Sequence, residues 1–67
     1  MTGTFGDYLR ERRLAVDVSM GQLARQSGFS HGYISLIEAG QRNPRAGTVK
    51  KLLVALAELE AAKTVAA

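Results

Sequence analysis

The chain has 67 residues, which is enough for one small domain and leaves no room for a second domain or a deep catalytic cleft. Its hydrophobic fraction of 46% argues against disorder, and the absence of cysteine excludes disulfide bonds and thiolate metal sites. Nine Lys and Arg residues against six Asp and Glu residues give a net charge of +3, which weakly favours nucleic acid as a partner.

The first predicted helix spans about residues 5–15. Thr4 can cap its amino end, because Asp7 follows three residues later as in a capping box. Phe5 and Leu9 then stand at helical spacing. Patterns of this kind recur along the chain while alternating strand patterns are nearly absent, so the sequence predicts an all-α protein.

A second, short helix is predicted from Ser19 to about Gln26. The Ser19 hydroxyl can accept a hydrogen bond from the backbone N–H of Gln22, whose side chain can reach back in a capping box. Helices often end at a residue in the left-handed conformation, which is usually glycine, and Gly28 stands at such a position. The sequence therefore predicts that the helix ends just before Gly28.

A third helix is predicted two residues after this glycine. It begins at Ser30 and runs to about Glu38 or Ala39, where Gly40 stops it. Residues of about 19–39 thus form helix, short turn, helix, which is the pattern of a helix-turn-helix. Two helices joined so tightly must cross steeply and leave one face of the second helix uncovered.

The last predicted helix covers roughly residues 46–62. Thr48 fits the cap position, but the amphipathic pattern also allows a start one turn earlier. The alanine-rich tail 61–67 is expected to fray. The apolar stripe of this helix consists of Val49, Leu52, Leu53, Leu56 and Leu59.

The third helix has two sides of different character. Ile34 and Ile37 share one side and are expected in the core. The opposite side has no charged residue, and its small, hydrogen-bonding groups suit close approach to the edges of DNA bases. Gly32 costs about 0.5–1 kcal/mol relative to alanine inside a helix, which is explained either by close approach to a partner or by tolerance near a helix start. This outer side and its flanks carry His31, Gly32, Tyr33, Ser35, Leu36 and Ala39.

Between residues 41 and 51 the chain carries four basic residues and no acidic one. They form either a solvated surface or a set of contacts to phosphate groups. The same two alternatives apply to three arginines of the first two helices. The residues concerned are Arg42, Arg45, Lys50 and Lys51 in the segment, and Arg10, Arg12 and Arg25 before it.

Residues 19–44, whose sequence is SMGQLARQSGFSHGYISLIEAGQRNP, resemble the Cro and lambdoid-repressor helix-turn-helix family, also called the xenobiotic-response-element type. The similarity begins at Phe5, ends near Leu56 and keeps its spacing without a gap in the helix-turn-helix. It implies a lambda-repressor-like DNA-binding domain, a four- to five-helix bundle whose third helix enters the major groove. Residues 1–67 are expected to form this single domain.

The resemblance also assigns roles by position. Its base-facing positions fall on His31, Gly32, Ser35 and Leu36, on the outer side that helical spacing also predicts. Its positions close to the phosphate backbone fall on Ser19, Met20, Ser30, Tyr33, Gln41, Arg42 and Arg45. The family pairs an arginine of the first helix with the acidic residue of the third, which implies a structural ion pair between Arg13 and Glu38.

Three features depart from the family's pattern. Asp17 stands where glycine is common in the turn between the first two helices. Met20 stands where many members have glutamine, so a side-chain contact from the second helix to phosphate is not implied. No glycine ends the fourth helix, so the family's dimerisation through a fifth helix does not carry over to this chain.

The sequence therefore predicts a sequence-specific double-stranded DNA-binding transcriptional regulator of the repressor kind. It is expected to bind a two-fold symmetric operator as a homodimer. The alternative is a protein-interaction module of antitoxin or co-activator type, which keeps the fold and has weak or no DNA binding. An enzyme is not expected, because one histidine and no cysteine provide neither a nucleophile–base pair nor metal-ligand spacing. No cofactor, metal or small-molecule ligand is implied.

No apolar run approaches the roughly 20 residues of a membrane span, and the amino end lacks the apolar region of a signal peptide. A membrane-surface role for the last helix is disfavoured, because its apolar stripe is needed to close the core. We therefore expect a bacterial or phage protein that acts in the cytoplasm at the nucleoid.

Overall fold

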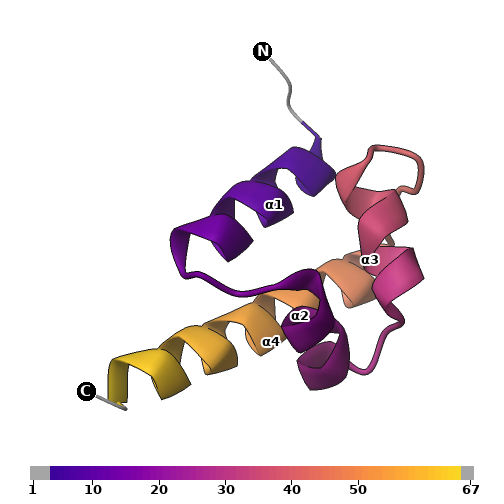
Figure 1. The fold of residues 1–67 in the computed structure, drawn as a ribbon. Helices are drawn as coiled ribbons and strands as arrows, with labels where there is room; N and C mark the ends of the chain where they lie inside the picture. Colours follow the sequence, from indigo (N-terminus) through magenta and orange to yellow (C-terminus); the bar gives the residue numbers. More distant parts are fainter. Residues whose placement is uncertain (1–3, 66–67) are drawn as a thin grey trace.

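The computed structural model describes residues 4–65, with side chains described for residues 4–63. Within this range the chain forms four α-helices and no strand (Figure 1). The helices are α1 (Phe5–Ala15), α2 (Met20–Ser27), α3 (His31–Glu38) and α4 (Ala46–Val65). The prediction of an all-α fold is confirmed, and the first three helices lie within about one residue of their predicted bounds.

Side-chain caps determine where the first three helices begin. Thr4, Ser19 and Ser30 each accept a hydrogen bond from the backbone N–H three residues later, at 3.1, 3.0 and 3.1 Å. In α2 the Gln22 side chain also accepts from the Ser19 N–H at 2.9 Å, which completes the predicted capping box. Each cap satisfies a donor that the helix itself leaves without a partner and stabilises it by about 1 kcal/mol.

The turns between the helices contain three residues with positive φ. Gly28 (φ 83°) ends α2 and Gly40 (φ 80°) follows α3, as predicted. Asp17 has φ 59° in the turn after α1, a left-handed conformation that Asp adopts more readily than most residues other than glycine. Asp17 therefore adopts a conformation typical of glycine, at a position where the Cro and lambdoid-repressor family commonly has glycine.

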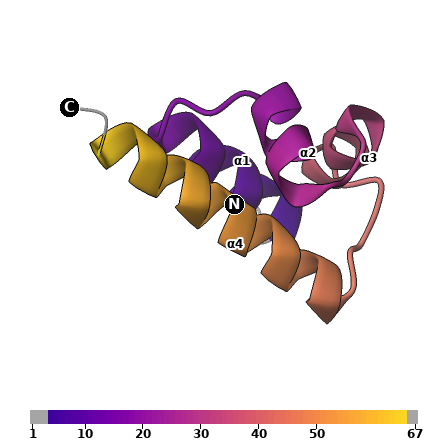
Figure 2. The same cartoon turned by 90° about the horizontal axis from the view of Figure 1, so that it is seen from below.

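The core is formed by side chains from all four helices. Five of them are at most 1% exposed: Leu9, Leu23, Ile34, Ile37 and Leu52. α2 packs against α3 and α4, and α1 packs against α3. Figure 2 shows α2 and α3 beside α4, with α1 partly behind it. Because burying each such side chain is worth about 1.5–3 kcal/mol, these contacts hold α2 and α3 in a fixed crossing.

Gly6 permits the close approach of α1 to α3. The residue is buried, and a Cβ atom at this position would lie 2.0 Å from the carbonyl oxygen of Ile37. Real Cβ atoms essentially never approach so closely, so no other residue fits without a shift of the backbone. The amino end of α1 thus helps to position the carboxyl end of α3.

The last helix is longer than predicted. α4 begins at Ala46, the earlier of the two starts that the sequence leaves open, and continues to Val65, about one turn past the predicted end. The structure describes helix as far as Val65, and the last two residues lie outside the described part, so the expected fraying of the tail 61–67 stays a prediction. Near this end Lys63 Nζ donates to the main-chain carbonyl of Asp17 and lies 3.9 Å from the Asp17 carboxylate, which connects α4 to the turn after α1.

Candidate nucleic-acid interface

α3 presents to solvent the side that the sequence predicts. Its two isoleucines are buried in the core, whereas His31 and Gly32 are exposed and Leu36 is 39% exposed. Ser35 is half-buried on the same side. The four residues predicted to face bases therefore share one accessible surface. Their contact with bases stays a prediction.

An aromatic pair at the start of α3 holds the following loop against this helix. The ring centroids of Phe29 and Tyr33 lie 5.4 Å apart, and the guanidinium carbon of Arg42 lies 5.7 Å from the Tyr33 centroid. Such a cation–π contact is worth about 0.5–1 kcal/mol at an exposed site. The family resemblance implies phosphate contact for both Tyr33 and Arg42, which stays a prediction. Their contact with each other could not be seen in the sequence, because packing across a loop leaves no periodic pattern.

The start of α2 offers backbone donors to a ligand. The capping box occupies the N–H groups of Ser19 and Gln22, so the first-turn donors that remain are those of Met20 and Gly21. The Met20 side chain is half-buried and packs against the core. Any contribution of Met20 to phosphate binding must therefore come from its backbone, where the partial positive charge of the helix end favours anions.

The loop after α3 carries the predicted basic residues on its surface. Gln41, Arg42 and Arg45 are all exposed. The Gln41 N–H donates to the carbonyl of Leu36 at 2.9 Å, which ties the beginning of the loop to α3. Arg42 is thus held beside the exposed side of α3, while Arg45 stands at the entry to α4.

Lys50 and Lys51 lie on α4, away from the start of α2. Both line a cleft that Gln26 and Ser27 also line, at the carboxyl end of α2. The start of α2 is about one helix length away, roughly 10 Å. The solvated-surface and phosphate-contact alternatives therefore both stay open for these two lysines.

Arg13 and Glu38 form the predicted ion pair. Arg13 Nε and Nη2 donate to the two carboxylate oxygens of Glu38, each at 2.8 Å, and Nη1 donates to the Val18 carbonyl at 2.9 Å. The two side chains are only 9% and 7% exposed. Hydrogen bonding to Glu38 raises the pKa of Arg13 above its ordinary value, against the opposite effect of burial. The pair joins α1 to α3 and neutralises the acidic residue of α3.

The structure separates two arginines that the sequence leaves equivalent. Arg12 lies toward α4, with Nη2 3.5 Å from Glu60 Oε1. Arg10 instead lines a surface cleft together with Ser35, beside the exposed side of α3. Helical spacing carries a signal for this difference, because Arg10 precedes Arg13 by three residues and shares its side of α1.

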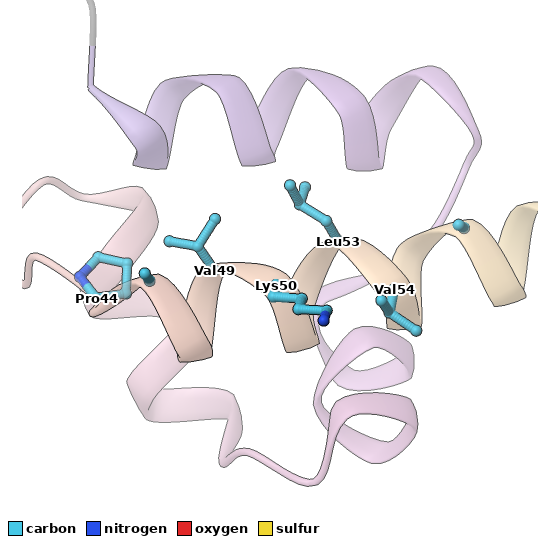
Figure 3. Close-up of a pocket in the computed structure, with 7 residues that line it drawn as sticks. Pro44, Val49, Lys50, Leu53 and Val54 are labelled. Atoms are coloured by element: carbon cyan, nitrogen blue, oxygen red, sulfur yellow. The ribbon is translucent and has the colours of Figure 1, made fainter.

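An open apolar groove of about 700 Å³ runs along α4. Figure 3 shows Pro44, Val49, Leu53 and Val54 along it, and Lys50 is the charged residue among those that line it. Aliphatic walls suit apolar contacts rather than acid–base chemistry.

Among residues 4–65, no three His, Asp or Glu side chains are close enough to share a metal ion. No helix in that range is long and apolar enough to cross a membrane.

Two short helices joined by three residues, with one side of the second helix exposed, define a helix-turn-helix domain. The chain belongs to the family described as "Helix-turn-helix domain", whose family model matches residues 4–63. The match covers α1, α2 and α3 and most of α4.

The chain is also similar to curated bacterial proteins. An uncharacterized HTH-type transcriptional regulator of Bacillus subtilis, RghRB, is 47% identical over 53 residues, 78% of this chain and 38% of the relative. The HTH-type transcriptional repressor RghR of the same organism is 44% identical over 54 residues, 79% of this chain and 40% of the relative. An uncharacterized HTH-type transcriptional regulator of Mycobacterium tuberculosis is 41% identical over 51 residues, 76% of this chain and 36% of the relative. The chain thus spans well under half the length of these relatives. No solved structure gives a significant match.

Proposed function

We propose that the chain is the DNA-binding domain of a transcriptional regulator that recognises double-stranded DNA by its sequence. The observation that carries this proposal is the exposed, uncharged side of α3, flanked by Arg42 and by the start of α2. A helix of eight residues is about 12 Å long and 10–12 Å wide with its side chains, which suits a major groove about 12 Å wide.

Within the groove the exposed residues of α3 have different tasks. Ser35 and His31 can donate or accept hydrogen bonds at base edges, and Leu36 can contact a thymine methyl group. Gly32 leaves the backbone bare, since nothing lies within 4 Å of the position that its Cβ would take. A well-placed base contact discriminates against the wrong base by about 1–3 kcal/mol.

Contacts to phosphate position the domain and carry no sequence information. Arg42, held against Tyr33, and Arg45 supply positive charge. The amino ends of α2 and α3 supply backbone donors and a partial positive charge. The other residues assigned to phosphate contact are Ser19, Met20, Ser30 and Gln41.

We further propose that two copies bind a two-fold symmetric operator as a homodimer. Two domains related by a two-fold axis would present their α3 helices to half-sites about 34 Å apart, one turn of DNA. If each copy neutralises about four phosphates, the logarithm of the affinity should fall with the logarithm of salt concentration with a slope near −7.

The relatives support a regulatory role. All three are named HTH-type transcriptional regulators or repressors, and the name of one Bacillus subtilis relative favours repression. Within the helix-turn-helix family, the sequence of residues 19–44 favours the Cro and lambdoid-repressor type. The proposal places the protein in the cytoplasm at the nucleoid, where it acts by binding and not by catalysis, without a cofactor.

A protein-interaction module is the second candidate function. The observation that favours it is the 39% exposure of Leu36 within an uncharged surface, which also suits an apolar patch on another protein. Charge reversal at Arg42 and Arg45 separates the two candidates. Loss of retention on a DNA column supports DNA binding, whereas capture of a protein partner by both forms, with no DNA retention by either, supports the interaction module.

Selection of bound duplexes from a random pool, with the protein-to-duplex ratio measured, tests the proposal. The expected result is an enriched motif with two-fold symmetry, bound by two copies of the chain. Failure to enrich any motif, together with no binding to duplex DNA at low salt, would contradict it.

A further inference from the structure

We infer that Arg10 is a further DNA-binding residue, which binds a backbone phosphate at the cleft where α1, α2 and α3 meet. The inference rests on the proposed DNA-binding function and adds a contact from α1. Neither the helical pattern nor the family resemblance assigns Arg10 to DNA.

The cleft adjoins the surface that the proposed function places on DNA. It has a volume of about 270 Å³ and is lined by Arg10, Arg13, Met20, Ser35, Glu38 and Ala39. Ser35 is one of the proposed base-facing residues, and Met20 lies at the amino end of α2, where phosphate contact is proposed. A duplex bound along α3 would therefore pass over the mouth of this cleft.

Arg10 supplies the positive charge of the cleft that is not already used within the fold. Arg13 donates to both carboxylate oxygens of Glu38 at 2.8 Å, so the Glu38 charge is neutralised by a buried partner. Arg10 is exposed, and it has neither an ion pair nor a side-chain hydrogen bond within the described residues. The charges of these three side chains sum to one positive charge, carried by a side chain that is free to meet a phosphate.

The chemistry of Arg10 fits a phosphate better than a base in this position. A guanidinium can donate two parallel hydrogen bonds to a pair of phosphate oxygens. Met20 lines the same cleft, and we expect its backbone N–H, which the capping box does not use, to donate to the same phosphate. The phosphate would thus be bound from α1 and from α2, which would also fix the angle at which α3 enters the groove.

Arg12 shows that placement, and not charge alone, carries the inference. It is two residues along the same helix, and its side chain is 45% exposed. It lies 3.5 Å from Glu60 on α4 and does not line the cleft. Arg12→Gln removes the same charge from the other side of α1 and is the matched control.

The test measures affinity for a mixed-sequence duplex of about 20 base pairs by fluorescence anisotropy, between about 50 and 200 mM salt. A duplex of arbitrary sequence suffices, because a phosphate contact carries no sequence information. Arg10→Gln should reduce the size of the log–log salt slope by about 0.9 per bound protomer, and the affinity about eight-fold at about 0.1 M salt. Arg10→Lys keeps the charge and should keep the slope. Arg12→Gln should match the wild type.

A wild-type slope and affinity for Arg10→Gln would overturn the inference and leave the proposed function standing. Equal losses for Arg10→Gln and Arg12→Gln would also overturn it, since they would reflect net charge alone. Failure of the wild-type protein to bind any duplex at about 50 mM salt would overturn the inference and the proposed function together. Arg10→Gln and Arg12→Gln, which both change exposed residues, should melt within about 3 °C of the wild type. Such a result excludes unfolding as the cause of a loss of DNA affinity.

Discussion

Replacing Gly6 with alanine should destabilise the domain, because α1 crosses α3 there with no room for a side chain. The new Cβ would lie 2.0 Å from the carbonyl oxygen of Ile37, 3.0 Å from its carbonyl carbon and 3.1 Å from the Cα of Glu38. Ordinary contact begins near 3.4 Å, so the two helices must separate by about 1.4 Å. All three atoms belong to the backbone of α3 and cannot rotate away as a side chain could.

The expected cost follows from two opposing effects. Overpacking costs about 1–3 kcal/mol, and a clash with backbone atoms belongs at the upper end of that range. Alanine in a helix is favoured over glycine by about 1 kcal/mol. The net loss of unfolding free energy is therefore about 2 kcal/mol, which lowers the Tm of a domain of this size by about 8–16 °C.

Thermal unfolding followed by circular dichroism measures this loss. Gly47→Ala is the matched control, because a Cβ at Gly47 in α4 would have nothing within 4 Å. Its Tm should equal or exceed that of the wild type. A Tm for Gly6→Ala equal to that of the control would refute the reasoning, since it would mean that α1 and α3 do not approach as closely as described.

Five other substitutions, in three experiments, test the ion pair and the proposed interface. Glu38→Gln should cost about 3 kcal/mol in urea unfolding, because it leaves a buried guanidinium without its counter-charge, whereas Arg12→Gln breaks an exposed pair and should cost less than about 1 kcal/mol. Equal losses would contradict the buried pair. Gly32→Ala should stabilise the helix by about 0.5–1 kcal/mol yet weaken DNA binding, and a gain in Tm with unchanged affinity would argue against close backbone approach. Ser35→Ala should relax base preference at one operator position by about 1–3 kcal/mol, whereas Arg42→Gln should weaken binding to every sequence alike. Uniform weakening by both would show that the base-facing assignment is wrong.

The helix starts could be predicted from the sequence because their causes are local. A hydroxyl three residues before a backbone N–H caps a helix wherever it occurs, as Ser19 and Ser30 do here. A glycine with positive φ ends a helix for equally local reasons, as Gly28 does. The exposed side of α3 also followed from helical spacing, since Ile34 and Ile37 could be assigned to the core.

The features that could not be predicted depend on contacts distant in the sequence. The contact between Lys63 and the turn at Asp17 joins residues 46 positions apart, and no pattern within the tail reveals it. The close approach at Gly6 likewise depends on the path of α3, because an isolated glycine in a helix gives no sign of what crosses it.

The candidate site shows the same division. Periodicity identified the exposed side of α3, whose contact with bases stays a prediction, and the family resemblance identified the Arg13–Glu38 pair. The contact between Arg42 and Tyr33 and the place of Arg10 in a cleft depend on how separate elements pack. Which bases the site prefers depends on side-chain positions in a complex with DNA, which neither helical spacing nor the fold determines.

The central claim is that the exposed side of α3 lies in the major groove. Its most direct test is an NMR titration of the ¹⁵N-labelled chain with the duplex recovered by selection. We expect the largest amide shifts at residues 30–36, at 20–21 and at Arg42, with small shifts along the outer side of α4. Large shifts along α4 with α3 unchanged would contradict it, because the duplex would then be bound by another surface.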